Sequence, residues 1–344
     1  MGDRSFGVQR DVCRALRCAL HDTHFPDAPD QAFARLRRLH LDCLPVPAGG
    51  HTLLRWRALA TVGAHDLGLG KLYESHVDAL AILSELEPSR AVACGAWAVW
   101  GAEAPGARLR ATPSADGGLR LSGRKAWCSG ARCVDHALLT AWRDDAHSIL
   151  VAVDLRQPGI TVTEEGWYAV GMARVPSGDI VFDNVHGRAV GQPGAYLARA
   201  GFWQGGAGVA ALWYGASVAI AEALQGRARR AARPDAHRLA HLGAIDLHLQ
   251  TTRALMREAA RDIDAHPRHD AFALATRVRA ACEQTASRVL EHAGRALGAT
   301  PFCRDAAFAR RSADLSVFIR QTHAERDLAA LGSAVSRETC NWML

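Results

Sequence analysis

The stretch Leu121–Gly130, LSGRKAWCSG, decides how this chain is interpreted. Apolar and polar residues alternate from Leu121 onward, which is the period expected of a β-strand with one buried face. The strand then ends on an indole, Trp127, followed by the small residues Ser129 and Gly130. From these residues alone two interpretations stay open: a core indole before an ordinary turn, or a strand end with a function.

Strand patterns continue on both sides of this stretch, between about residues 97 and 195. Asp116-Gly117-Gly118 predicts a hairpin turn directly before the strand. Further strands are separated by Gly, Pro and Asp turns and are predicted at residues 136–141, 148–154, 160–163 and 179–185. We therefore predict a β-barrel or sandwich domain over residues 93–197.

Helical patterns flank this β-domain. Apolar residues recur at spacings of three and four from Leu53 to Leu86, which predicts an N-terminal helical domain over residues 1–92. After Gly201 helix-breaking residues are rare. Four long helices are predicted there, one ending near Arg233 and the others at about residues 239–263, 272–296 and 305–335. Because the connections are short, residues 198–344 should form an antiparallel four-helix bundle. The predicted fold class is α+β.

Composition narrows the class of protein. The chain has 344 residues, 49% of them hydrophobic, which is enough for a large core. Its formal charge of +6 is carried by arginines spread along the chain, which argues against a nucleic-acid surface. No apolar run reaches the roughly 18 residues of a membrane span, and charged residues interrupt the N-terminus where an export signal would be apolar. We expect a cytoplasmic protein that binds neither nucleic acid nor membrane.

Three smaller features bear on redox, metal or ligand chemistry. The nine cysteines contain no CxxC spacing, which is typical of reduced thiols. His237 and His241 would share a helix face, but no third ligand lies near them in the sequence, so no metal site is predicted. The basic run at residues 226–233 precedes Pro234; it is either a solvated helix end, a site for a phosphorylated ligand, or a nucleic-acid contact.

Several motifs in the right order resemble the acyl-CoA dehydrogenase superfamily of flavoproteins. Gly123–Ala131, GRKAWCSGA, is similar to that family's G-x-K-x-W-I-[ST]-x-[GA] strand. Val170–Arg174 and Ser177–Val185, VGMAR and SGDIVFDNV, resemble its next conserved strand, and GGAGVAA from Gly205 resembles its first bundle helix. The resemblance extends from about residue 53 to residue 335 and implies that family's fold.

The resemblance also implies a flavin site. Trp127 would lie beside the isoalloxazine ring of FAD, and the Ser129 hydroxyl would lie at flavin N5, where a group that both donates and accepts suits both redox states. Small neighbours would let backbone N–H groups, including that of Cys128, approach the ring. Backbone contacts are implied from Trp100 and Ala102, although this segment lacks the Ser-Asp that the family uses near the pyrophosphate.

Two further contacts implied by the resemblance come from the bundle. Arg227 stands where the family has an arginine that reaches a neighbouring subunit's FAD, although the Phe-Gly that usually follows is missing. Gly298 stands at the family's glycine turn, before Arg304-Asp305. A homodimer or homotetramer is therefore expected.

The catalytic base of an acyl-CoA dehydrogenase is missing. A dehydrogenase needs a carboxylate to remove the α-proton, yet the aligned position holds Arg320, Gln321 or Thr322, and the alternative position holds Gly205. His323 or Glu325 could substitute only after a local shift of the chain.

Three functions stay open. The first is an FAD-dependent oxidoreductase that acts on an acyl-CoA or a similar small molecule with a relocated base. The second is a monooxygenase that uses reduced FMN or FAD as co-substrate with O2, supplied by an electron-transfer or flavin-reductase partner. The third is a degenerate member that serves as an oligomeric binding or scaffold protein. No catalytic residue is assigned.

Overall fold

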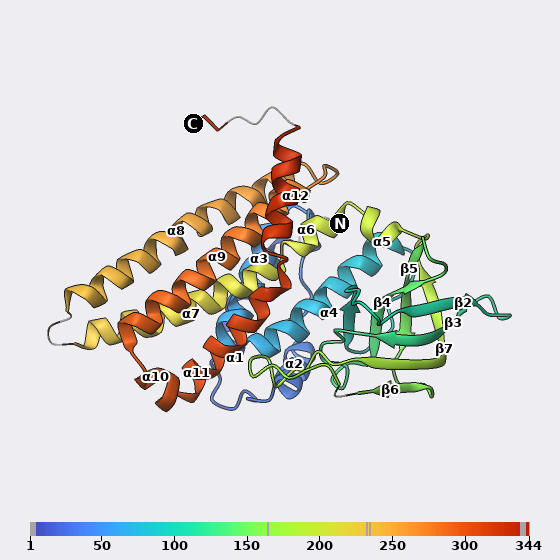
Figure 1. Ribbon diagram of the computed structural model, residues 1–344, viewed down its shortest axis with the longest axis horizontal. Coiled ribbons are helices and arrows are strands. Elements are labelled where there is room, and N and C mark those ends of the chain that lie inside the picture. Colours follow the sequence, from blue (N-terminus) through green and yellow to red (C-terminus); the bar gives the residue numbers. More distant parts are fainter. Residues whose placement is uncertain (1–4, 164, 232, 234, 338–341, 344) are drawn as a thin grey trace.

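The computed structural model describes residues 5–163, 165–231, 233, 235–337 and 342–343. Helices come first, a β-barrel follows, and a bundle of long helices closes the chain, with the barrel at one end of an elongated molecule (Figure 1). This order confirms the predicted fold class. The boundaries placed at residues 92 and 197 stay predictions.

Four helices form the N-terminal part: α1 (Ser5–Leu20), α2 (Pro29–Arg38), α3 (Thr52–His65) and α4 (Leu67–Leu86). The Asp66 carboxylate accepts a hydrogen bond from the Leu69 N–H at 2.8 Å, which caps the start of α4 directly after α3 ends. One face of α4 packs against the barrel, where Ser75 Oγ and His76 Nδ1 accept hydrogen bonds from the first strand. The opposite face of α4 meets the bundle, so this helix connects the two halves of the molecule (Figure 1).

Seven strands form the β-domain: β1 (Trp97–Trp100), β2 (Leu109–Pro113), β3 (Leu119–Lys125), β4 (His136–Trp142), β5 (Ser148–Asp154), β6 (Ile160–Val162) and β7 (Ile180–Val190). The strand order is β1-β4-β2-β3-β7-β5, and β4 also pairs with β5, so five strands close into a barrel. Alternate residues of β2 and β3, such as Leu109 and Leu121, fill its interior. The predicted hairpin between β2 and β3 is confirmed, with Gly117 at φ 82°.

The bundle is built from α7 (Val209–Arg230), α8 (Ala236–Ala265), α9 (Phe272–Leu297), α11 (Ala306–Phe318) and α12 (Glu325–Val335). Short helices α5 (Ala195–Ala198), α6 (Gly201–Gly206) and α10 (Thr300–Arg304) connect the longer elements. The basic run 226–233 includes the last turn of α7, as the helix-end interpretation expects.

The predicted helix over residues 305–335 is wrong, because it is two helices. A 3-10 turn, η1 (Ile319–Gln321), ends α11, and the Thr322 hydroxyl donates to the Ile319 carbonyl at 2.9 Å. Ala324 then adopts φ 43°, a left-handed conformation that an uninterrupted helix does not allow. No Gly or Pro marks this break in the sequence.

The core of the bundle is a close contact between α3 and α7. A Cβ atom on Gly63 would lie 2.5 Å from the Leu212 carbonyl oxygen, and one on Gly215 would overlap the Ala60 carbonyl oxygen. The helical stretch Gly201–Arg230 contains an 18-residue window with the mean hydropathy (1.4) of a membrane span, but 72% of that window is buried inside the protein. That burial is typical of a core helix.

The α3–α7 contact makes a stability prediction. Gly215→Ala should lower the free energy of unfolding by about 2–3 kcal/mol, because the added methyl group overlaps backbone that cannot move independently. Gly243→Ala in α8 is the matched control: nothing lies within 4 Å of its Cβ position, so it should raise stability by about 0.5–1 kcal/mol through helix propensity. Urea denaturation measures both. Equal effects of the two substitutions would contradict the close contact.

Candidate functional site

The indole of Trp127 projects from the end of β3. Trp127 adopts φ 61°, which is uncommon for a residue other than glycine, and 49% of it is exposed. Its neighbours Ala126 and Cys128 are both buried. Trp167 meets the indole edge-to-face, with ring centroids 6.3 Å apart. The backbone therefore turns one large aromatic face outward between two residues that face the core.

Buried polar contacts hold the backbone before Trp127. Lys125, only 1% exposed, donates to Glu103 Oε1 and to Thr140 Oγ1, each at 2.7 Å. Burial lowers the pKa of the Lys125 ammonium, and the ion pair with Glu103 opposes this shift. Burial alone raises the pKa of the Glu103 carboxyl, but hydrogen bonds from Lys125 and Thr140 hold it below its ordinary value. The pair ties the loop after β1 to strands β3 and β4.

The residues after Trp127 are fixed as well. The Ser129 carbonyl accepts a hydrogen bond from the Trp100 indole at 3.1 Å, and the Ser129 and Ser177 hydroxyl oxygens lie 2.6 Å apart. Ser129 is only 9% exposed. Gly130 adopts φ 69°, and a Cβ atom there would overlap the Leu72 side chain of α4. A hydroxyl bonded to Ser177 still has acceptor capacity, since it carries two lone pairs and one proton.

A cavity of about 290 Å³ opens beside Trp127. Small residues form most of its wall, and one charged pair, Arg124 Nε to Asp179 Oδ2 at 2.5 Å, closes one side. Its lining consists of Ala104, Pro105, Gly106, Ala107, Arg124, Ala126, Trp127, Gly166 and Asp179. A flat ring can stack on an indole in such a space, because small neighbours do not obstruct its face. The residues present therefore fit a flavin ring system.

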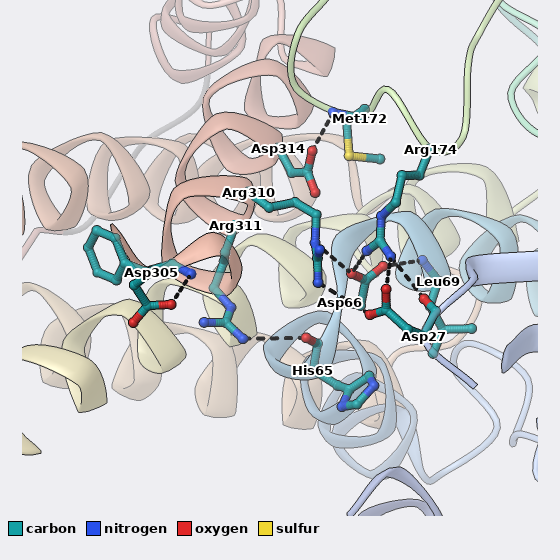
Figure 2. Close-up of polar contacts among 11 residues, drawn as sticks. Asp27, His65, Asp66, Leu69, Met172, Arg174, Asp305, Arg310, Arg311 and Asp314 are labelled. Carbon is teal, nitrogen blue, oxygen red and sulfur yellow. Dashed lines mark hydrogen bonds and ion pairs between the residues drawn. The ribbon is translucent and has the colours of Figure 1, made fainter. Parts of the chain in front are cut away.

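The loop that carries Trp167 and Ser177 is anchored by charges (Figure 2). Arg174 forms ion pairs with Asp66 and, at 3.4 Å, with Asp27; Arg310 of α11 reaches the same two carboxylates at 3.9 and 3.3 Å. This group of four residues holds the loop against the start of α4 and against α11.

Asp314 adds a second anchor for the same loop. Its carboxylate accepts a hydrogen bond from the Met172 N–H at 2.5 Å (Figure 2). Burial raises the pKa of the Asp314 carboxyl. The position of Ser177 beside Ser129 thus depends on contacts from three distant parts of the chain.

Five of the predicted cofactor residues lie at the end of the barrel near Trp127. Trp100 is buried and touches the site only through its bond to Ser129, whereas Ala102 lies exposed in the loop next to Glu103. Cys128 is buried, and its N–H donates to the Gly178 carbonyl at 2.9 Å, so that N–H already has a partner within the chain.

The other two predicted residues lie at the far end of the bundle. Arg227 is in the last turn of α7, and Gly298 ends α9 with φ 64° (Figure 1). A flavin bound at Trp127 of the same chain cannot reach them. Their roles toward a neighbouring subunit's cofactor stay predictions.

The aligned base position holds no carboxylate directed to a site. Arg320 is exposed and pairs with Glu283 at 3.0 Å, and the Thr322 hydroxyl is used within its own turn. His323 is 58% exposed at its side chain and pairs with Asp327 at 3.3 Å. The absence of a catalytic base at this position stays a prediction.

Two histidines have partners within the fold. His76 is buried, with Nε2 at 3.1 Å from Asp42 and Nδ1 accepting from the Trp97 N–H. The Nδ1 atom of His241 lies 3.0 Å from Nδ1 of His292 on α9. Within the described residues, no group of three or more His, Cys, Asp or Glu side chains could hold a metal ion.

Sequence reasoning did not assign Ser177, Trp167, Arg124 or Asp179 to the site. Ser177, Gly178 and Asp179 stand in the quoted SGDIVFDNV segment, which was a usable signal because β7 pairs with β3. Trp167 follows a turn and carries no periodic pattern.

Comparison with known proteins agrees with this geometry. Residues 101–185 match the acyl-CoA dehydrogenase middle-domain family. The dibenzothiophene monooxygenase of Rhodococcus erythropolis is 34% identical over 98 residues, which are 26% of this chain and 23% of that enzyme. The chain thus matches about a quarter of the length of these curated relatives.

Solved structures resemble the chain along almost its whole length. Dibenzothiophene monooxygenase from Paenibacillus sp. A11-2 with FMN and indole has a TM-score of 0.78 at 19% identity, covering 97% of this chain and 98% of that one. Butyryl-CoA dehydrogenase from Megasphaera elsdenii has a TM-score of 0.80 at 16% identity, covering 96% of this chain and 98% of that one. Nitrososynthase from Micromonospora carbonacea var. africana has a TM-score of 0.80 at 20% identity, covering 95% of this chain and 96% of that one.

These matches define the fold. The chain has the acyl-CoA dehydrogenase fold, as the resemblance implied. Its segment 101–185, which contains Trp127 and Ser129, matches the acyl-CoA dehydrogenase middle-domain family.

The Glu103–Lys125 pair makes a pH-dependent prediction. Glu103→Gln should lower the free energy of unfolding at pH 7 by about 1–3 kcal/mol, because buried Lys125 loses its counter-charge while Glu103 itself is partly exposed. Since the pKa of Glu103 is lowered on folding, its contribution is fully present above the ordinary carboxyl pKa of 4.5 and is lost as the pH falls through the lowered value. The difference between wild type and variant should therefore shrink below that pH.

Urea denaturation from pH 8 down to about pH 2.5, which extends through the range where the lowered pKa of Glu103 lies, measures this effect. Asp145→Asn is the control, because Asp145 pairs with Arg108 at the surface with 82% of its side chain exposed; it should change stability by less than about 0.5 kcal/mol. A gap between wild type and Glu103→Gln that stays constant with pH would contradict the assigned ion pair.

Proposed function

We propose that this chain is a flavin-dependent oxidoreductase that acts as a monooxygenase, using reduced flavin and O2 on a small-molecule substrate. The observation that carries the proposal is the outward face of Trp127 beside a cavity, two residues before Ser129, whose hydroxyl lies 2.6 Å from that of Ser177. The sequence similarity to dibenzothiophene monooxygenases over 98 residues, and the match of residues 101–185 to the middle-domain family, also support the proposal.

The missing base favours a monooxygenase over a dehydrogenase. Proton removal next to a thioester needs a positioned carboxylate, and Arg320, Gln321, Thr322 and Gly205 offer none. Activation of O2 by reduced flavin needs a shielded ring and no such base. To act as the base instead, His323 would have to give up its contact with Asp327.

Each residue has a distinct role in this proposal. When bound, the flavin supplies the electrons. Trp127 supports one ring face, Ser129 exchanges a hydrogen bond at N5, and Ser177 keeps the Ser129 hydroxyl oriented. Trp167 and the anchored loop exclude water from the edge of the ring. The Arg124–Asp179 pair lies where a polar flavin side chain would pass.

FMN is the proposed flavin, with FAD as the alternative. Support comes from the absence of the Ser-Asp that would contact a pyrophosphate and from the FMN complex of the Paenibacillus monooxygenase. A flavin reductase would then supply reduced FMN. We further propose a cytoplasmic homodimer or homotetramer that binds no nucleic acid or membrane. Arg227 and Gly298, at the opposite end of the bundle, are the residues proposed to serve a neighbouring subunit.

An acyl-CoA dehydrogenase is the second candidate. The TM-score of 0.80 with butyryl-CoA dehydrogenase supports it at the level of the fold alone. Butyryl-CoA mixed anaerobically with the flavin-loaded protein separates the two functions. Bleaching of the flavin absorbance would contradict the monooxygenase proposal, and unchanged absorbance is the expected result. A chain that binds neither flavin would instead be a binding or scaffold protein.

The Trp127 site makes a binding prediction. Trp127→Ala should weaken FMN binding roughly tenfold, since one stacking face is lost. Ser129→Ala should change binding less than about threefold but should slow reoxidation of bound reduced FMN by O2. Flavin fluorescence titration and stopped-flow absorbance measure the two quantities.

Trp342→Ala is the matched control for this experiment. Trp342 is 86% exposed and lies in the sequence far from the residues that line the cavity. FMN affinity should not change in this variant. If Trp127→Ala and Trp342→Ala bind FMN equally well, the flavin does not bind at Trp127.

A further inference from the structure

Charged side chains line the face of α4 that meets the bundle. Lys71, Glu74 and Asp78 follow one another at helical spacings of three and four, and their side chains are 13%, 15% and 16% exposed. Arg55 of α3, 3% exposed, and Arg279 of α9 face the same row. We call these five residues the polar seam. Charges in such a buried position are rare unless they are paired or bind something.

Four of the five charges are matched. Lys71 pairs with Glu74 at 3.2 Å, and Arg55 pairs with Asp78 at 3.8 Å. Arg279 forms no ion pair with any carboxylate in the described part of the chain. Its guanidinium donates to two backbone carbonyls, Gly206 at 2.8 Å and Gln321 at 3.1 Å. The five side chains of the polar seam therefore carry a net charge of +1, and the Arg279 guanidinium is attracted to the carboxylates of Asp327 and Glu74 without pairing directly with either.

An unused hydrogen-bond donor lies beside that charge. Trp213 of α7 is 0% exposed, and within the described residues its indole N–H has no partner. The Arg279 guanidinium carbon lies 5.3 Å from the centre of the Trp213 ring. A buried N–H without a partner costs about 1–3 kcal/mol, and almost all buried polar groups in proteins are satisfied. The cation contact with the ring offsets only part of this cost.

The residues around these groups extend from open space beside Gly206 to the anchored loop that carries Trp167. A Cβ atom on Gly206, whose carbonyl binds Arg279, would meet nothing within 4 Å. The Phe318 ring meets the Trp213 ring edge-to-face, with ring centroids 6.2 Å apart. The Lys71 ammonium nitrogen lies 5.6 Å from the centroid of the Phe318 ring. The preceding residue, Val317, contacts position 171 in the anchored loop that carries Trp167.

An oxyanion satisfies both features at once, because it neutralises a guanidinium and accepts an N–H bond. We propose that Arg279 and Trp213 form a subsite for a carboxylate or phosphate group of the substrate, with the Lys71–Glu74 pair at its edge. This inference rests on the proposed function, since it places a substrate beside the flavin site. It assigns that substrate to the class of small molecules that carry an oxyanion.

Inorganic phosphate and acetate are the probes. Each is titrated into the full chain at constant ionic strength, with chloride as the balancing anion, and binding is followed by calorimetry and by the midpoint of thermal unfolding. Wild type should bind at least one probe saturably. Trp213→Phe keeps the ring but removes the N–H, so it should weaken binding roughly tenfold. Arg279→Gln should abolish binding.

Two further variants keep the test decisive. Trp203→Phe changes another indole, which packs against Phe272 at 4.8 Å, and should bind the probes like wild type. Arg279→Lys retains the charge without the planar fork and should bind between wild type and Arg279→Gln, even if Arg279→Gln fails to fold. Binding of phosphate but not acetate would assign the group as a phosphate, and the reverse result would assign a carboxylate.

Three results would overturn the inference. The first is that neither probe binds saturably above the chloride control. The second is that Trp213→Phe binds the probes as tightly as wild type. The third is that FMN displaces phosphate, which would mean that the flavin's own phosphate occupies the subsite. Flavin titration of the same variants keeps the two proposals apart. Loss of probe binding with intact FMN binding contradicts only the subsite. Loss of FMN binding with intact probe binding contradicts only the flavin site.

Discussion

Trp127 can face solvent only because the backbone on both sides of it is held inward. Lys125 is fixed by Glu103 and Thr140 before it, and the Ser129 carbonyl is fixed by the Trp100 indole after it. Between these fixed points a single residue takes a left-handed conformation and turns its side chain out. The rest of the proposed site, including the cavity beside the indole, depends on this arrangement.

The second requirement is a loop that stays in place. Residues 165–179 have little regular structure, yet they carry Trp167 and Ser177 to the end of β3. Ion pairs from Arg174, together with the carboxylate of Asp314, connect this loop to both helical parts of the chain (Figure 2). The helices therefore do more than support the barrel, because they set the position of the wall that faces the proposed flavin.

Much of this was predictable from local patterns in the sequence. The period of two between Leu119 and Lys125 predicted β3, and the motif order from Gly123 to Val185 predicted the fold and the strand end that carries Trp127. Such signals work because they depend on neighbouring residues. The break of the last helix at Thr322 was missed, since no Gly or Pro announces it and a side-chain hydrogen bond within the turn decides it.

Long-range pairing could not be predicted in the same way. Arg174 meets Asp27 and Asp66 across more than a hundred residues of sequence, and nothing in the local pattern of α7 marks Trp213 as a donor without a partner. Arg227 and Gly298 show a different limit: the roles that the resemblance implies for them would require a second subunit, so these roles stay predictions.

The most direct test of this account is a crystal structure of the protein grown with FMN. The account predicts the isoalloxazine ring against the exposed face of Trp127, with N5 within hydrogen-bonding distance of the Ser129 hydroxyl. Density for FMN elsewhere on the molecule, with the face of Trp127 covered by the protein's own side chains, would contradict it.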